Sequence, residues 1–160
     1  MVQSTWGGLS AATGVGTITL SIWLAKLPNR IVCDRLVEEF FTSSTFLHWH
    51  FSSSHKSSFM SKYRLLWSCQ HAAINGADEK APVSLSFFAL TCLMMATSLL
   101  FLPHDLGYLT EDRPDEIRHS IYSVGRQALA QSEVEDPPDI YRVEALLMDG
   151  VYSKYDGRPK

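Results

Sequence analysis

The sequence lacks the short motifs that mark the common catalytic folds. It has no nucleophile elbow, no glycine-rich phosphate loop, no dinucleotide-binding fingerprint and no histidine–glutamate metal motif. Each of those motifs places a nucleophile, a phosphate or a cofactor, so their absence argues against a typical hydrolase, kinase or dehydrogenase. We therefore expect no cofactor.

Cysteine is scarce. The three cysteines, Cys33, Cys69 and Cys92, are an odd number and do not have the spacing of a metal site. They predict neither a disulfide framework nor a bound metal. Cys92 stands in an apolar run and is expected to be a small buried hydrophobe. This pattern favours a reducing, intracellular and cytoplasmic setting.

Charge is also limited, because only 19% of the residues are charged and the net charge is −3. A nucleic-acid surface would be basic, so no direct contact with nucleic acid is expected. The acidic residues are unevenly placed. Residues 1–103 contain seven Lys/Arg and five Asp/Glu, whereas residues 104–160 contain seven and twelve. An acidic segment of this kind usually forms a solvated face.

One long uncharged run is present. The twenty residues 83–102 satisfy the length criterion for a membrane-spanning helix. The run also contains several serines and threonines, and its ends lack a clear basic flank, so a buried core helix is favoured. The apolar residues 11–27 are not preceded by the positive charges of a signal peptide. We do not expect a membrane protein.

The spacing of apolar residues predicts helices over most of the chain. An apolar helix face is predicted within 33–41, and a second helix, capped by Ser57 or Ser58, carries Phe59, Tyr63, Leu66 and Trp67. A core helix is expected over 83–102, an amphipathic helix over 114–130, and a last helix that Asp139 caps and Gly157 ends. Polar loops at 75–82 and 104–114 and an acidic connector at 134–138 separate them.

These elements predict an all-α fold, a single compact helical domain of about five to six helices over residues 28–160. Residues 1–27 form an N-terminal extension of uncertain structure, in which the residues from Thr17 to Leu24 suit a strand or a helix equally.

The segment from Phe46 to Trp67 holds the candidate site. His48, His50 and His55 fall within eight residues, beside Trp49 and Phe51. Imidazoles that donate, accept or titrate near neutral pH stand there among large apolar rings. We take His48, His50 and His55 as candidate catalytic residues; the candidate substrate-binding residues are Trp49, Phe51, Tyr63, Trp67, Asp149 and Tyr152. Alternatively, His55 hydrogen-bonds at a helix start, the tryptophans belong to the core, and Asp149 and Tyr152 lie at a solvated helix end.

The order of these motifs resembles the regulatory domain of fungal zinc-cluster transcription factors, the middle homology region. The resemblance covers the helix at 36–41, the sequence from His55 to Trp67 and the long helix over 81–103 that ends in Leu-Pro. It continues in the helix over 140–158, with its Ala-Leu-Leu core and terminal Gly-Arg. The resemblance implies a helical domain that senses small molecules.

Two departures from that family shape the functional expectation. No six-cysteine zinc cluster is present, and the chain stops where the family's domain continues through further helices. The sequence therefore corresponds to the N-terminal half of such a domain, over residues 28–160, without its DNA-binding module. We expect helix faces exposed by this truncation to be covered by a second copy, by residues 1–27 or by a ligand.

Three functions follow as alternatives. The first is a helical protein repurposed to bind a hydrophobic natural-product intermediate and to promote its cyclisation or isomerisation, for example a pericyclic step of the Diels–Alder type. The second is a transcriptional co-regulator that acts through protein–protein contacts, in the nucleus, without binding DNA. The third is a stable helical domain whose histidines have only structural roles.

Overall fold

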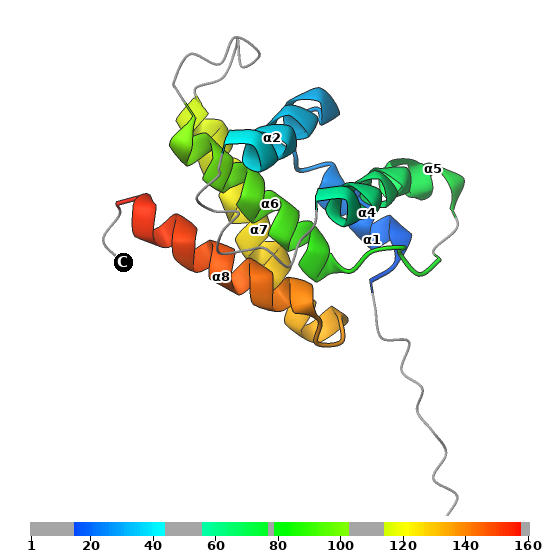
Figure 1. The fold of residues 1–160 in the computed structure, drawn as a ribbon. Helices are drawn as coiled ribbons and strands as arrows, with labels where there is room; N and C mark the ends of the chain where they lie inside the picture. The colour runs from blue at the N-terminus through cyan, green and yellow to red at the C-terminus, as the bar shows by residue number, and fades with distance from the viewer. Residues whose placement is uncertain (1–14, 44–55, 77–78, 103–113, 158–160) are drawn as a thin grey trace, which may run out of the picture.

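The protein is described by a computed structural model over residues 15–43, 56–76, 79–102 and 114–157. Within these ranges the only β-type pairing is an isolated antiparallel bridge between Gly16 and Lys80, so the predicted all-α class is confirmed (Figure 1). The helices are α1 (Thr17–Leu24), α2 (Arg30–Ser43), α4 (Lys56–Ser68), the 3₁₀ turn η1 (Cys69–His71), α5 (Ala72–Asn75), α6 (Leu85–Phe101), α7 (Pro114–Glu135) and α8 (Ile140–Tyr155).

Helix α6 is the centre of the molecule, and Figure 1 shows α7 and α8 running beside it. Every residue from Leu85 to Leu99 is buried, which confirms the predicted core helix. The helix ends at Phe101 because Pro103 follows Leu102 in the sequence and disfavours a helical conformation in the residue before it. No helix in the described ranges has the length and apolar character needed to cross a membrane.

Helix α7 packs closely against α6 and is longer than predicted. It begins at Pro114, as expected, but continues past Ala130 to Glu135, so the prediction of a connector from Val134 was wrong. The extra turn is held because Ser132 is buried, its hydroxyl donates to the Leu129 carbonyl oxygen, and its own carbonyl oxygen accepts from Arg142. The helix then ends just before the Pro137-Pro138 pair.

Helices α2 and α4 cover another side of α6. The predicted apolar face of α4 is confirmed, since Phe59, Tyr63, Leu66 and Trp67 are all buried. The predicted cap at Ser57 or Ser58 was wrong, because the helical hydrogen-bonding pattern already includes Lys56. Side-chain capping is seen instead at α2, where the side-chain oxygen of Asn29 accepts from the Val32 N–H at 3.0 Å.

Residues 17–24, whose sequence suits a strand or a helix, form helix α1. Its Leu20 and Leu24 are buried in the common core. The chain before α1 pairs with the segment before α6, through Thr17 N–H to the Glu79 carbonyl oxygen (2.8 Å) and Ala81 N–H to the Val15 carbonyl oxygen (3.0 Å). This pairing fixes one wall of the candidate site described below.

All three cysteines are free and buried, and Cys92 lies in the core as predicted. Burial raises the pKa of the Cys33 thiol to about 12, with a smaller contribution from the neighbouring Asp34 carboxylate. Burial also raises the pKa of the Cys69 and Cys92 thiols, and a raised pKa in apolar surroundings is typical of structural cysteines.

Candidate functional site

The histidine cluster predicted as the catalytic site lies outside the described residues. His48, Trp49, His50, Phe51 and His55 all fall in the range 44–55. Their catalytic and substrate-binding roles stay predictions.

Tyr63 and Trp67, the two aromatic residues predicted to bind substrate from α4, lie in the core between α2, α4 and α6. The Tyr63 hydroxyl donates to Asp34 Oδ1 at 2.8 Å, and its ring meets Trp67 edge-on at 6.2 Å. Burial raises the pKa of Tyr63 far above its ordinary value. The Arg30 guanidinium lies 5.6 Å from the Trp67 ring centre. In this arrangement both rings pack and orient helices.

Asp149 and Tyr152, the two candidates on α8, connect that helix to α7. Asp149 accepts a hydrogen bond from the Tyr122 hydroxyl at 2.7 Å and pairs with Arg126 at 2.6 Å. The buried Tyr152 ring stacks on Tyr122 with 3.8 Å between the ring centres. Arg118 donates to the Tyr152 hydroxyl at 3.0 Å. Neither candidate lines the pocket described next.

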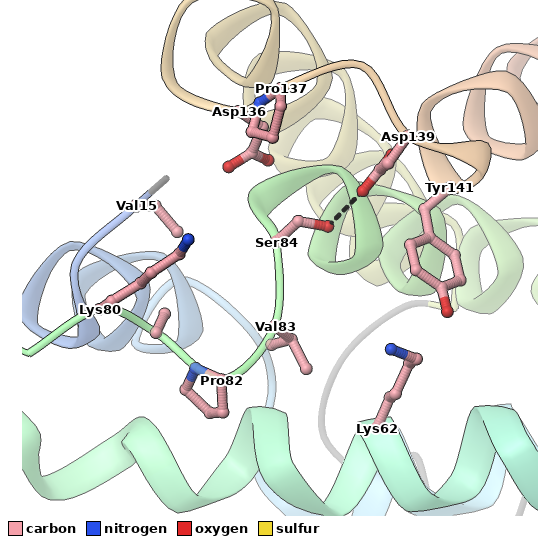
Figure 2. A pocket seen from close by; sticks show the side chains of 11 residues that line it. Val15, Lys62, Lys80, Pro82, Val83, Ser84, Asp136, Pro137, Asp139 and Tyr141 are labelled. Atoms are coloured by element: carbon pink, nitrogen blue, oxygen red, sulfur yellow. Dashed lines mark hydrogen bonds between the residues drawn. The ribbon is translucent and has the colours of Figure 1, made fainter. Parts of the chain in front are cut away.

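A pocket of about 260 Å³ lies where the segment before α6, helix α4 and the connection between α7 and α8 meet (Figure 2). Its walls are mostly apolar, with two carboxylates, two ammonium groups, one serine hydroxyl and one phenol. The lining residues are Val15, Lys62, Lys80, Ala81, Pro82, Val83, Ser84, Asp136, Pro137, Asp139 and Tyr141.

The polar side of the pocket is built from the N-termini of two helices. Ser84 caps α6 by accepting from the Phe87 N–H, and Asp139 caps α8 by accepting from the Arg142 N–H at 2.9 Å. The hydroxyls of Ser84 and Ser86 each lie 2.8 Å from the Asp139 carboxylate and donate to it. One carboxylate therefore ties the two helix starts together.

Asp136 is the most unusual residue of the pocket. The residue is 6% exposed, and its Oδ2 atom accepts from the Ser86 N–H at 2.9 Å. Its Oδ1 atom is buried and has no hydrogen-bond partner in the described part of the chain. Burial raises the pKa of Asp136, while the N–H groups of Ser86, Leu85 and Val15 act in the opposite direction.

Lys62 and Lys80 bring positive charge to the same pocket. The Lys62 ammonium lies 5.1 Å from the centre of the Tyr141 ring, and Figure 2 shows Lys80 extending toward the side where Val15 and Asp136 lie. Among the described residues, neither lysine has a carboxylate within ion-pairing distance. The pocket thus combines charges of both signs that do not neutralise each other by contact.

The sequence predicts Asp139 as a helix cap, which is confirmed, but it does not predict the pocket. Asp136 was assigned to a connector, and nothing in its spacing indicates the contact with Ser86, fifty residues earlier. The available signal was an Asp-Pro-Pro-Asp sequence between two helices. No cluster of side chains that could hold a metal ion is present in the ranges described.

Comparison of the chain with protein-family models, with curated proteins and with solved structures gave no match.

Proposed function

We propose that the protein binds a small molecule with an apolar body and a polar head in the pocket beside Asp136, and promotes its cyclisation or isomerisation without a cofactor. The observation that supports this most is the buried Oδ1 atom of Asp136, a residue that lines the pocket, because this atom has no hydrogen-bond partner among the described residues. A ligand that donates a hydrogen bond would complete it.

The energetic argument is that an unpaired buried acceptor is costly. Leaving such a group unsatisfied costs about 1–3 kcal/mol, so nearly all buried polar groups have a partner. An exception that faces a cavity is a typical feature of a binding site. A ligand that restores the missing hydrogen bond gains this free energy on binding.

The chemical argument concerns the raised pKa of Asp136. Because burial raises its pKa, the Asp136 carboxyl group holds a proton more readily than an exposed aspartate does. Such a group can hold a substrate hydroxyl or enol and accept its proton, or, once protonated, donate a hydrogen bond to a carbonyl oxygen. Either step suits an isomerisation or a cyclisation in which the apolar walls position the rest of the substrate.

The size of the pocket limits the ligand. Its volume of about 260 Å³ lies just below the usual range of ligand pockets, which begins at about 300 Å³. A small natural-product intermediate, or the reacting end of a larger one, is the expected class of substrate. The resemblance to the fungal regulator domain implies a helical body of the right kind.

The test is a melting-temperature and turnover assay with terpenoid and polyketide-type carbonyl compounds. We expect at least one compound to raise the melting temperature and to be converted, and Asp136→Asn to abolish both effects. The matched control is Glu133→Gln, which removes an exposed carboxylate close to the same connection. A complete absence of stabilisation and conversion would overturn the proposal.

A second candidate function is supported by the outer face of α8, whose large apolar side chains are half exposed. The exposed fractions are 57% for Ile140, 51% for Val143, 51% for Leu146 and 54% for Leu147. A face of this kind suits the co-regulator alternative, or a homodimer, in which another helix covers it. It does not depend on the pocket.

Sedimentation velocity tests the homodimer. The expected result is a dimer that Leu147→Glu dissociates, while Ile74→Glu, a substitution at a 79% exposed residue of α5, does not. A monomer at every concentration would exclude the homodimer.

A further inference from the structure

We propose that the polar head of the pocket's ligand is a zwitterion, with an ammonium group that contacts Asp136 and a carboxylate that contacts Lys62 or Lys80. The ligand class is then an apolar amino acid or a close relative of one. This inference rests on the proposed small-molecule site and specifies the chemistry that the site selects.

The carboxylate side of the pocket favours a cationic donor. Asp136 presents one buried oxygen without a partner, and Asp139, whose oxygens are occupied by the serine hydroxyls, adds a second negative charge nearby. A charge-assisted hydrogen bond from an ammonium group is about twice as strong as one between neutral groups. An ammonium therefore fits this position better than a hydroxyl does.

The lysine side of the pocket favours an anion. Lys62 and Lys80 come from different segments, and neither meets a carboxylate among the described residues, although both line the same pocket as Asp136 and Asp139. Figure 2 shows Lys62 and Lys80 on opposite sides of Pro82 and Val83. A ligand carboxylate reaching either ammonium would complete the ion pair that the protein itself leaves open.

The balance of charge distinguishes a zwitterion from a simple acid or a simple amine. The pocket contains two carboxylates and two ammonium groups, so a ligand with one charge would satisfy one side and leave the other unpaired. The apolar lining by Val15, Pro82, Val83 and Pro137 then accommodates the hydrocarbon part. All three parts of an apolar amino acid thus have a counterpart.

The experiment is isothermal titration calorimetry with three probes that share one hydrocarbon body. Leucine carries both charges, 4-methylpentanoate lacks the ammonium, and 3-methylbutylamine lacks the carboxylate. We expect leucine to bind at least about tenfold more tightly than either single-charge probe, because only leucine makes both charge-assisted contacts.

Substitutions in the pocket test which side chain binds each charged group of the ligand. Lys80→Ala and Lys62→Ala are expected, singly or together, to weaken leucine and 4-methylpentanoate without affecting 3-methylbutylamine. Asp136→Asn is expected to weaken leucine and 3-methylbutylamine and to spare 4-methylpentanoate. The matched control is Lys154→Ala, because Lys154 lies 5.4 Å from the Tyr155 ring centre much as Lys62 lies over Tyr141, but does not line the pocket.

The outcomes separate this inference from the function on which it rests. Equal affinity for the three probes, or no binding of any of them, overturns the zwitterion assignment. An uncharged terpenoid aldehyde, citral, is titrated in parallel. Binding of citral that Asp136→Asn weakens, together with no preference for leucine, leaves the small-molecule site standing, whereas no binding of any compound removes both proposals.

Discussion

Asp136 combines two features that rarely occur together at one residue. One of its oxygens helps to hold the start of α6 through the Ser86 N–H, and the other is buried without a partner in the described chain. The first feature alone would be ordinary helix capping. The second gives the residue an unused hydrogen-bonding capacity inside a pocket, and that capacity is the basis of the proposed function.

The raised pKa of Asp136 also predicts how the free energy of unfolding depends on pH. Because burial raises its folded-state pKa above the ordinary value of 3.8, the folded protein holds this proton more firmly than the unfolded chain. As pH rises from that ordinary value to the folded-state pKa, the unfolded chain loses its proton first, so the stability contributed by this group falls. The slope is at most about 1.4 kcal/mol per pH unit, and the stability levels off above the folded-state pKa.

Urea unfolding of the native protein and of Asp136→Asn across this pH window measures the effect. The stability difference between the two proteins should shift against the native protein as pH rises, and then become constant. A difference that does not change with pH would show that burial does not raise the pKa of Asp136.

Gly125 shows how closely α6 and α7 pack. A Cβ atom at this position would lie 2.9 Å from Cys92 Cβ and 3.3 Å from Leu93 Cγ. Gly125→Ala should therefore destabilise the fold by about 1–3 kcal/mol in urea unfolding, despite the better helix propensity of alanine. The control is Gly150→Ala in α8, where a Cβ atom meets nothing within 4 Å, and a gain of about 1 kcal/mol is expected. Equal effects at the two glycines would contradict the close approach.

Among the elements, the N-termini of α6 and α8 behave as one unit because both depend on Asp139. Asp139→Ala should destabilise the fold by about 2 kcal/mol or more, since it removes a helix cap and leaves the Ser84 and Ser86 hydroxyls without their acceptor. In a double-mutant cycle, Ser84→Ala and Asp139→Ala should cost less together than the sum of the single changes. Strict additivity would mean that the two caps act independently.

Most of the helices could be predicted from the sequence, but the residues at which they begin and end were predicted less well. The long uncharged run identified α6, and the apolar spacing identified the buried face of α4, because burial on one side of a helix leaves a direct periodic signal. The predicted helix ends were wrong where tertiary contacts determine the last helical residue. Helix α7 runs to Glu135 because Ser132 is buried and bonded to Arg142, and no local pattern records such a contact.

At the scale of the whole molecule, the pocket is an assembly of segments far apart in the chain. Val15, Lys62, Lys80 and Asp136 meet there because the chain just before α1 pairs with the segment before α6 and the α7–α8 connection lies at the same end. In the sequence, the strongest local concentration of polar and aromatic groups is the histidine–aromatic stretch. An isolated aspartate and two lysines far apart in the chain give no comparable local signal.

The most direct test of the central claim is a ¹H–¹⁵N NMR titration of the labelled protein with leucine, and with citral as the uncharged comparison. Saturable shifts are expected for the amides of Lys80, Ser86 and Tyr141 around the pocket, with little change at Leu146 and Leu147 on the outer face of α8. Saturable shifts confined to the outer face of α8, at Leu146 and Leu147, or no shifts with either compound, would contradict a small-molecule site beside Asp136.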